Sequence, residues 1–342
     1  MGGPEVRGLA AGMAGHRGSG VQRSDQVEEP HPGRQLGVDG RVEVLDAVEA
    51  QEGRMARVPV LDAEVGLVDR GFALDGEVDG DGGVVAVAAA LLDRAASRPQ
   101  RVVVTSFEAF EDLEALASKL SGVVDLPCEV IDASRAAVAG ECTFGAGRAA
   151  GDQLHVGLGS AAGGIVLGGE VQRGATGRSS SPAWVVVDPA GPSHPYGPRG
   201  CLAAYADLGA IERHAHSLGI TGERPSREGD DVDVLSNLVE RARRGCLLSR
   251  RVVDDAARAV GVVAGGLLNV LDVCDVVVHC PVAEAWVFGA QTTREATERH
   301  GFASIVDGVR WHLASLGDEA VGLGVLALLD DRGHDGAREG VS

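Results

Sequence analysis

The feature that most constrains the fold is a regular alternation of short apolar runs and longer amphipathic runs. Arg101–Phe107 and Cys128–Asp132 are apolar runs rich in β-branched residues, which predicts buried strands. Phe110–Gly122 and Ala133–Gly147 have helical spacing, and the first of these ends at a glycine. Because strands that alternate with helices build layered sheets, this stretch predicts an α/β fold.

Weaker signals precede this stretch. Glu64–Gly80 predicts a β-hairpin with turns at Asp-Arg-Gly and Asp-Gly, and Gly83–Ser97 predicts a buried helix. Residues 1–57 show no sustained period and form a poorly defined amino-terminal segment, in which Arg41–Gln51 predicts a strand leading into a helix.

The carboxyl-terminal half continues the alternation. A hairpin is predicted from strands at Leu154–Leu158 and Ile165–Leu167, and a helix from about Leu202. Glu223–Asp233 predicts a charged surface loop. The remaining predicted elements are a strand at Trp184–Val187, a long helix at Ser249–Val273, a strand at Cys274–Cys280, and helices at Thr293–His300, Ile305–Leu316 and Asp318–Asp331.

Composition narrows the class of protein. The 342 residues carry 50 acidic and 31 basic side chains, a net charge of −19, which argues against a general binder of nucleic acid or of anionic membranes. The apolar stretches are too short to span a bilayer, and the amino terminus lacks the apolar core of a signal peptide. Six scattered cysteines predict reduced thiols, and together these features predict a cytoplasmic protein.

Two places carry candidate chemistry. Asp132 follows a strand and precedes a helix, where a carboxylate serves either as an ordinary N-cap or as part of a ligand site. The bare turn Gly159–Gly164 lets backbone amides approach a phosphate, with the Ser160 hydroxyl as a further donor. The alternative for the turn is a plain hairpin whose neighbours leave no room for side chains.

The order of these motifs and those that follow resembles the ROK family (repressor, open reading frame, kinase). The further motifs are GAGR at Gly145–Arg148, RGATG at Arg173–Gly177, VVVDPAG at Val185–Gly191, YGPRGCLAAYADLGAIE at Tyr196–Glu212 and GLLNVLDVCDVVVHCPVAEA at Gly266–Ala285. The resemblance covers roughly Arg101 to Asp331.

The resemblance implies a two-lobed, actin-like (ribonuclease H-like) ATPase/sugar-kinase fold. It places a smaller α/β lobe at residues 58–132 plus 317–332 and a larger α/β lobe at residues 133–316, followed by a loose tail at 333–342. It also implies a homo-oligomer.

In active members of the family a sugar and ATP–Mg²⁺ meet between the lobes. By resemblance, Asp132 contacts the sugar and accepts the proton of its attacking hydroxyl. Gly159, Ser160, Gly163 and Gly164 match the phosphate-binding turn. Ser181 and Trp184 stand where the family has the first and last residues of a Glu-x-Gly-His stretch that binds sugar and zinc.

The sequence departs from the family pattern at several of these places. The glycine turn is one residue short, and the amino-terminal Asp-x-Gly-Gly-Thr phosphate motif is absent. The family's Cys-x-Cys-Gly zinc loop appears as His194-Pro195-Tyr196-Gly197. With Cys201 this leaves two zinc ligands at most, whereas a tetrahedral structural site needs four, so zinc is not expected.

These departures favour a non-catalytic, sugar-sensing protein that resembles the family's transcriptional regulators. One alternative is an active sugar kinase that uses ATP and Mg²⁺ with Asp132 as general base, and another is a structural remnant. A sugar is the expected partner, no membrane partner is expected, and DNA is expected only if residues 1–57 hold an unrecognised DNA-binding module.

Overall fold

The protein is represented by a computed structural model that describes residues 42–47, 56–62, 66–72, 101–106, 113–160, 162–174, 181–220 and 231–338. All of these lie in the compact unit Leu36–Ser342. The helix predicted at Gly83–Ser97 and the helix predicted to follow the strand near Arg41–Gln51 lie outside the described residues.

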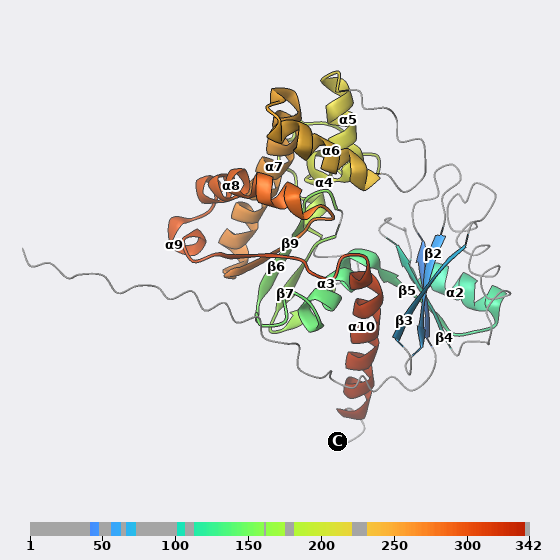
Figure 1. The fold of residues 1–342 in the computed structure, drawn as a ribbon. Coiled ribbons are helices and arrows are strands. Elements are labelled where there is room, and N and C mark those ends of the chain that lie inside the picture. The colour runs from blue at the N-terminus through green and yellow to red at the C-terminus, as the bar shows by residue number, and fades with distance from the viewer. Residues whose placement is uncertain are drawn as a thin grey trace, which may run out of the picture. The chain divides into compact units, whose positions relative to one another are not determined.

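The first sheet has five strands in the order β3-β2-β1-β4-β5. The parallel strands β1 (Val42–Ala47), β4 (Arg101–Ser106) and β5 (Cys128–Asp132) pair in register, and Ser106 lies opposite Asp132. The antiparallel strands β2 (Ala56–Asp62) and β3 (Gly66–Phe72) complete it. Helix α2 (Leu113–Val124) packs against β5 (Figure 1).

The second sheet has the order β10-β9-β6-β7-β8. Its strands are β6 (Gln153–Gly157), β7 (Gly164–Leu167), β8 (Glu170–Val171), β9 (Asp275–His279) and β10 (Arg310–Leu313). β6, β9 and β10 are parallel, and β6-β7-β8 is an antiparallel meander. The hairpin predicted around the glycine turn is therefore confirmed.

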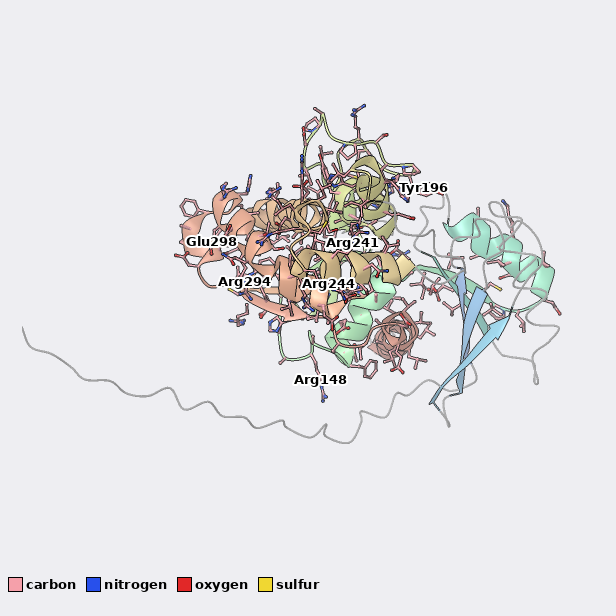
Figure 2. All side chains as sticks on the ribbon, turned by 45° about the horizontal axis from the view of Figure 1, so that its top comes forward. Arg148, Tyr196, Arg241, Arg244, Arg294 and Glu298 are labelled. Carbon is pink, nitrogen blue, oxygen red and sulfur yellow. The ribbon has the colours of Figure 1, made fainter. Side chains whose placement is uncertain are left out.

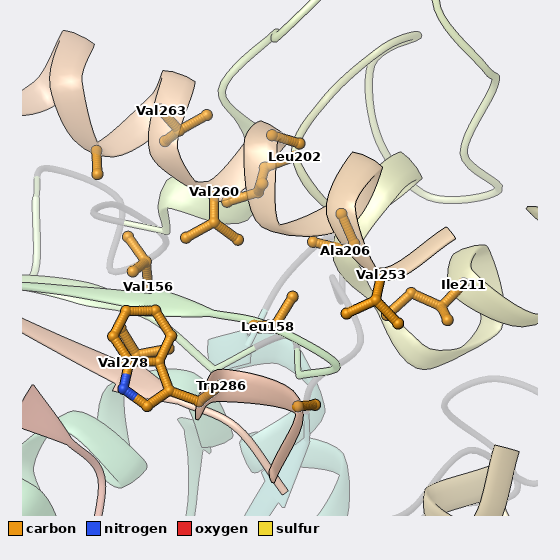
Figure 3. Close-up of a cluster of buried hydrophobic side chains, with 14 of the residues drawn as sticks. Val156, Leu158, Leu202, Ala206, Ile211, Val253, Val260, Val263, Val278 and Trp286 are labelled. Atoms are coloured by element: carbon orange, nitrogen blue, oxygen red, sulfur yellow. The ribbon is translucent and has the colours of Figure 1, made fainter. Parts of the chain in front are cut away.

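The larger hydrophobic core lies on one face of this second sheet. Leu154, Val156 and Leu158 alternate along β6 and its end, and the side chains of α7 (Leu247–Leu271) pack over them. Figure 3 shows Val253, Val260 and Val263 of α7 opposite Val156, Leu158 and Val278. Helices α5 (Leu208–Ser217), α6 (Asp231–Arg243) and α8 (Ala283–His300) add to the same core.

On the opposite face of β6, the polar side chains of Gln153 and His155 lie beside Cys142 of helix α3 (Ala133–Thr143). Helix α3 crosses α10 (Glu319–Arg338), and buried alanine and valine side chains of the two helices form a second core with Val103 and Ile131 of the first sheet. The period-two pattern of β6 therefore separates an apolar face from a polar one.

Several predicted elements differ from the structure. The helix predicted at Ile305–Leu316 is wrong, because α9 (Ala303–Val306) is short and β10 follows it. Trp311 and Leu313 both pack on the larger core from alternate positions, which is the period of a strand rather than of a helix. Pairing with β9 satisfies the backbone groups along one edge of β10.

The strand predicted at Trp184–Val187 is also wrong. The chain forms the 3₁₀ helix η1 (Pro182–Trp184), followed by a single bridge between Val186 and Cys201. Pro182 favours the first turn of a helix because its nitrogen has no hydrogen to donate.

Other predicted boundaries also differ from the structure. The Asp-Arg-Gly turn predicted within Glu64–Gly80 lies inside β3, which pairs with β2, since strand pairing outweighs local turn propensity. The rest of that predicted hairpin, from residue 73 on, lies outside the described residues. Helix α6 begins at Asp231, inside the predicted charged loop, and α10 continues to Arg338, beyond the predicted start of a loose tail. The helix predicted from Leu202 is divided into α4 (Ala203–Ala206) and α5 at Asp207. The predicted domain boundaries stay a prediction.

Candidate functional site

Asp132 ends β5 and is the N-cap of α3. Its Oδ1 accepts a hydrogen bond of 2.9 Å from the backbone nitrogen of Arg135. Burial raises the pKa of Asp132, and hydrogen bonds from Arg135 and Ser134 with the charge of Arg135 offset part of this rise. The residue therefore acts as a helix cap and also keeps a more basic carboxylate, the property that a proton acceptor needs.

The glycine turn is bare because its neighbours leave no room for side chains. A Cβ at Gly163 would lie 3.0 Å from the carbonyl oxygen of His155 and 3.2 Å from Cδ of Pro182. Gly159 has a φ of +71°, and a Cβ there would lie 2.7 Å from Leu235. The steric explanation of the turn is sufficient for these two glycines.

Two of the turn's backbone amides have partners inside the protein. The nitrogen of Gly159 donates to the carbonyl oxygen of Ala206 at 2.7 Å. The nitrogen of Ala162 donates to Oγ of Ser160 at 3.0 Å, so this hydroxyl closes the turn on itself. These two amides are therefore not directed at a ligand.

The predicted site residues come from three elements that the structure brings together. Ala162 of the turn belongs to the same buried cluster as Ala133 and Ala136, which follow Asp132 in α3. On another side of the turn, Gly163 approaches Pro182, the residue between Ser181 and Trp184. Asp132, the turn and η1 are therefore linked through adjoining packing contacts.

Ser181 and Trp184 flank η1 in different environments. Ser181 is the N-cap of η1 by position, but its side chain makes no capping hydrogen bond. The Trp184 ring meets the His194 ring edge-on, with centroids 5.5 Å apart. The structure thus assigns Trp184 a packing role, while Ser181 keeps a hydroxyl beside the turn.

A buried polar network beneath the turn was missed by the sequence analysis. His155 of β6 and His279 of β9 lie with Nδ1 and Nε2 3.0 Å apart, and Nε2 of His155 lies 3.1 Å from Oε1 of Gln153. Burial lowers the pKa of His279 to about 4 and that of His155 well below its usual value, so both rings are neutral at neutral pH. Polar residues at alternate positions of two apolar strands were the available signal.

The hydrogen bonds of this network fix the ring tautomers. The amide nitrogen of Gln153 donates to the carbonyl oxygens of Gly147, Ala150 and Gly151, which directs its oxygen towards His155. Nε2 of His155 therefore donates, and its Nδ1 accepts from His279. The fully buried Glu141 accepts from the backbone nitrogens of Ala146, Ser315 and Leu316, which connects α3 to the segment before α10.

Comparison with known proteins places this arrangement in a family. The ROK family model matches residues 74–332, which is most of the chain. The chain belongs to the ROK family. A glucokinase of Halalkalibacterium halodurans is 28% identical over 213 residues, which are 60% of this chain and 64% of that glucokinase. The match therefore spans less than two thirds of the length of this relative.

Solved ROK structures share the fold. A ROK family transcriptional regulator, a homologue of the Escherichia coli Mlc protein, superposes with a TM-score of 0.67 at 15% identity over 85% of this chain and 78% of that one. A ROK family glucokinase from Streptomyces griseus gives 0.65 at 22% identity over 84% and 99% of the two chains. The fold is the mixed α/β, two-lobed actin-like fold of ROK sugar kinases, as the resemblance implied.

Two further findings concern the described ranges. None of the helices there combines the length and the apolar character that a membrane crossing requires. Over the same ranges, His, Cys, Asp and Glu side chains do not gather in groups of three or more that suit a metal ion.

Proposed function

We propose that this ROK protein binds a sugar without phosphorylating it, in a sensing role related to that of the family's regulators. The observation that carries this proposal is the closed glycine turn. A phosphate-binding turn directs its backbone amides at the ligand. Here the amides of Gly159 and Ala162 donate to Ala206 and Ser160 instead, which disfavours a phosphate at this place.

The sugar contacts are proposed at Asp132 and Ser181. A carboxylate accepts hydrogen bonds from sugar hydroxyls, and a serine hydroxyl donates or accepts. The Ser181 side chain is not used for capping η1, and Gly163 of the turn packs against the residue that follows it. With Trp184 engaged by His194, the proposed sugar site depends on these two polar side chains more than on aromatic stacking.

A kinase is the second candidate, because the Halalkalibacterium halodurans relative is a glucokinase and Asp132 suits a general base. ATP–Mg²⁺, when bound, would supply the phosphoryl group, and Gly159, Ser160, Gly163 and Gly164 would be its phosphate contacts. This chain would then need its turn to open, since the amides of Gly159 and Ala162 must leave their present partners.

The ligand, the oligomeric state and the DNA partner are also proposals. A small sugar is the proposed ligand, and a homo-oligomer is proposed from the family resemblance. DNA binding would depend on residues 1–57, most of which lie outside the described residues.

Calorimetric titration tests the proposal with glucose, mannose, N-acetylglucosamine and N-acetylmannosamine, each with and without ATP–Mg²⁺. We expect one sugar to bind with the same affinity in both conditions. Asp132→Asn should weaken binding by about tenfold or more, because hydrogen bonds to a charged group contribute about 1.5–3 kcal/mol. Asp307→Asn is the control, because it makes the same exchange at an exposed residue that ends α9, a helix that packs against α7 and α8. Absence of binding by all four sugars would contradict the sensing role for these ligands.

A further inference from the structure

Four residues at the positions of the family's zinc ligands lie together beside η1. Trp184 ends η1, His194 and Tyr196 lie in the following loop, and Cys201 begins the turn into α4. The His194 ring meets the Trp184 ring at 5.5 Å and the Tyr196 ring at 6.1 Å, both edge-on. The chain thus conserves the convergence of these positions but not the zinc-binding side chains.

His194 has no ring nitrogen to offer a metal ion. Its Nδ1 accepts a hydrogen bond of 3.2 Å from the backbone nitrogen of Tyr196. Its Nε2 lies 2.8 Å from Oδ2 of Asp207, to which it donates. Because a metal ligand needs a free lone pair on one ring nitrogen, binding would break one of these contacts.

Cys201 is equally unsuited to a metal. Its side chain is fully buried, and burial raises the pKa of its thiol, whereas zinc binds the thiolate. The Trp184 ring fills the space beside it: a Cβ at Gly197 would lie 2.6 Å from the ring and 3.2 Å from Sγ of Cys201. The residues present therefore do not fit zinc.

Asp207 connects this cluster to the glycine turn. Besides meeting His194, its Oδ1 caps α5 by accepting from the backbone nitrogen of Ala210. The residue before it, Ala206, accepts the hydrogen bond from Gly159. His194 therefore holds Asp207, and the neighbouring residue Ala206 holds Gly159 of the turn.

We propose that an interlock of Trp184, His194, Tyr196, Cys201 and Asp207 replaces the metal, and that His194 is the positioning residue that holds the α4–α5 junction against the Gly159 turn. Tyr196 covers the outer edge of the interlock and is 52% exposed (Figure 2). The interlock does not depend on the proposed function, because it concerns how the turn is held and not what the turn binds.

Metal content and hydrogen exchange test this inference on the full chain. Purified protein should contain no stoichiometric zinc by elemental mass spectrometry, and a chelator should leave its thermal midpoint unchanged. His194→Phe keeps a ring but loses both hydrogen bonds, so we expect exchange at Gly159 and at the α5 amino terminus to accelerate by about tenfold. His194→Gln, which keeps a donor and an acceptor, should restore part of the protection.

The matched control is His216→Phe, since His216 is an exposed histidine on α5 whose Nε2 lies 3.7 Å from Oε1 of Glu212 in an i,i+4 pair. It should leave exchange at the turn unchanged. One zinc per chain whose removal lowers the thermal midpoint would overturn the inference. So would a His194→Phe variant that exchanges at Gly159 like the parent protein, and if that variant fails to fold, His194→Ala removes the same two hydrogen bonds without a new ring and gives the same test.

Discussion

At the scale of single residues, ionisation is most constrained at His155 and His279. Both rings are buried, and Nε2 of His279 donates its hydrogen to Nδ1 of His155. Burial is the largest cause that lowers the pKa of each ring. Glu141 opposes it at His279, whereas His279 and His312 add to it at His155. The neutral pair is therefore a condition of the native packing between α3 and the second sheet.

Stability should consequently fall in mild acid. Between pH 6.5 and about 4 the unfolded chain binds a proton at His279 that the folded chain does not, so stability is complete above this window and decreases as the pH falls. The drop in the pKa of His279 corresponds to a loss of about 3 kcal/mol in the free energy of unfolding. Urea unfolding at a series of pH values measures it, and His279→Gln, which keeps a donor for His155, should flatten the dependence. An unchanged pH dependence in His279→Gln would refute this account.

Asp132 shows what a single sequence position can and cannot predict. The strand-to-helix position predicted an N-cap, and the hydrogen bond from Arg135 confirms it. The competing use as a ligand contact stays a prediction, because the hydrogen bonds from Arg135 and Ser134 do not by themselves decide whether a ligand also binds the carboxylate.

At the scale of elements, the crossing of α3 and α10 depends on two glycines. A Cβ at Gly324 would lie 1.6 Å from the carbonyl oxygen of Ala136, and one at Gly140 would lie 2.2 Å from that of Ala320. The backbones therefore approach as closely as they do only because both positions lack side chains. This crossing carries the second core, which includes residues of the first sheet and Ala162 of the turn.

Replacing one of these glycines by alanine should separate the helices. Gly324→Ala is expected to destabilise the protein by about 1–3 kcal/mol, the range for overpacked cores. Gly266→Ala is the matched control, because Gly266 is an exposed helical glycine in α7 with nothing within 4 Å of its Cβ position, so the protein should gain up to about 1 kcal/mol. Chemical denaturation measures both, and equal effects of the two substitutions would contradict the described crossing.

Elements with a strong local pattern were predictable, and elements defined by tertiary pairing were not. The long apolar run of α7 and the β-branched runs of β4, β5 and β9 were predicted within a few residues. β10 was taken for a helix because its four residues become a strand only by pairing with β9. The interlock around His194 and the pair of His155 and His279 join residues that are not neighbours in sequence, so their contacts could be seen only in the fold.

At the scale of the whole molecule, the chain has the ROK fold, and we propose that its site serves sensing. The interlock around His194 does without the family's zinc ligands, and the glycine turn is closed by hydrogen bonds to Ala206 and Ser160. Asp132 nevertheless keeps its place at the start of α3. If Asp132 binds a sugar as we propose, this carboxylate beside a closed turn suits sensing better than phosphoryl transfer.

The most direct test of this account is a search for phosphorylated sugar by mass spectrometry. The protein would be incubated with ATP–Mg²⁺ and a saturating amount of each sugar that binds in the titration, beside Asp132→Asn as the catalytic blank. The account predicts no sugar phosphate above the level of Asp132→Asn, although the sugar binds. Accumulation of sugar phosphate by the parent protein and not by Asp132→Asn would show that the protein is a kinase and contradict the sensing role.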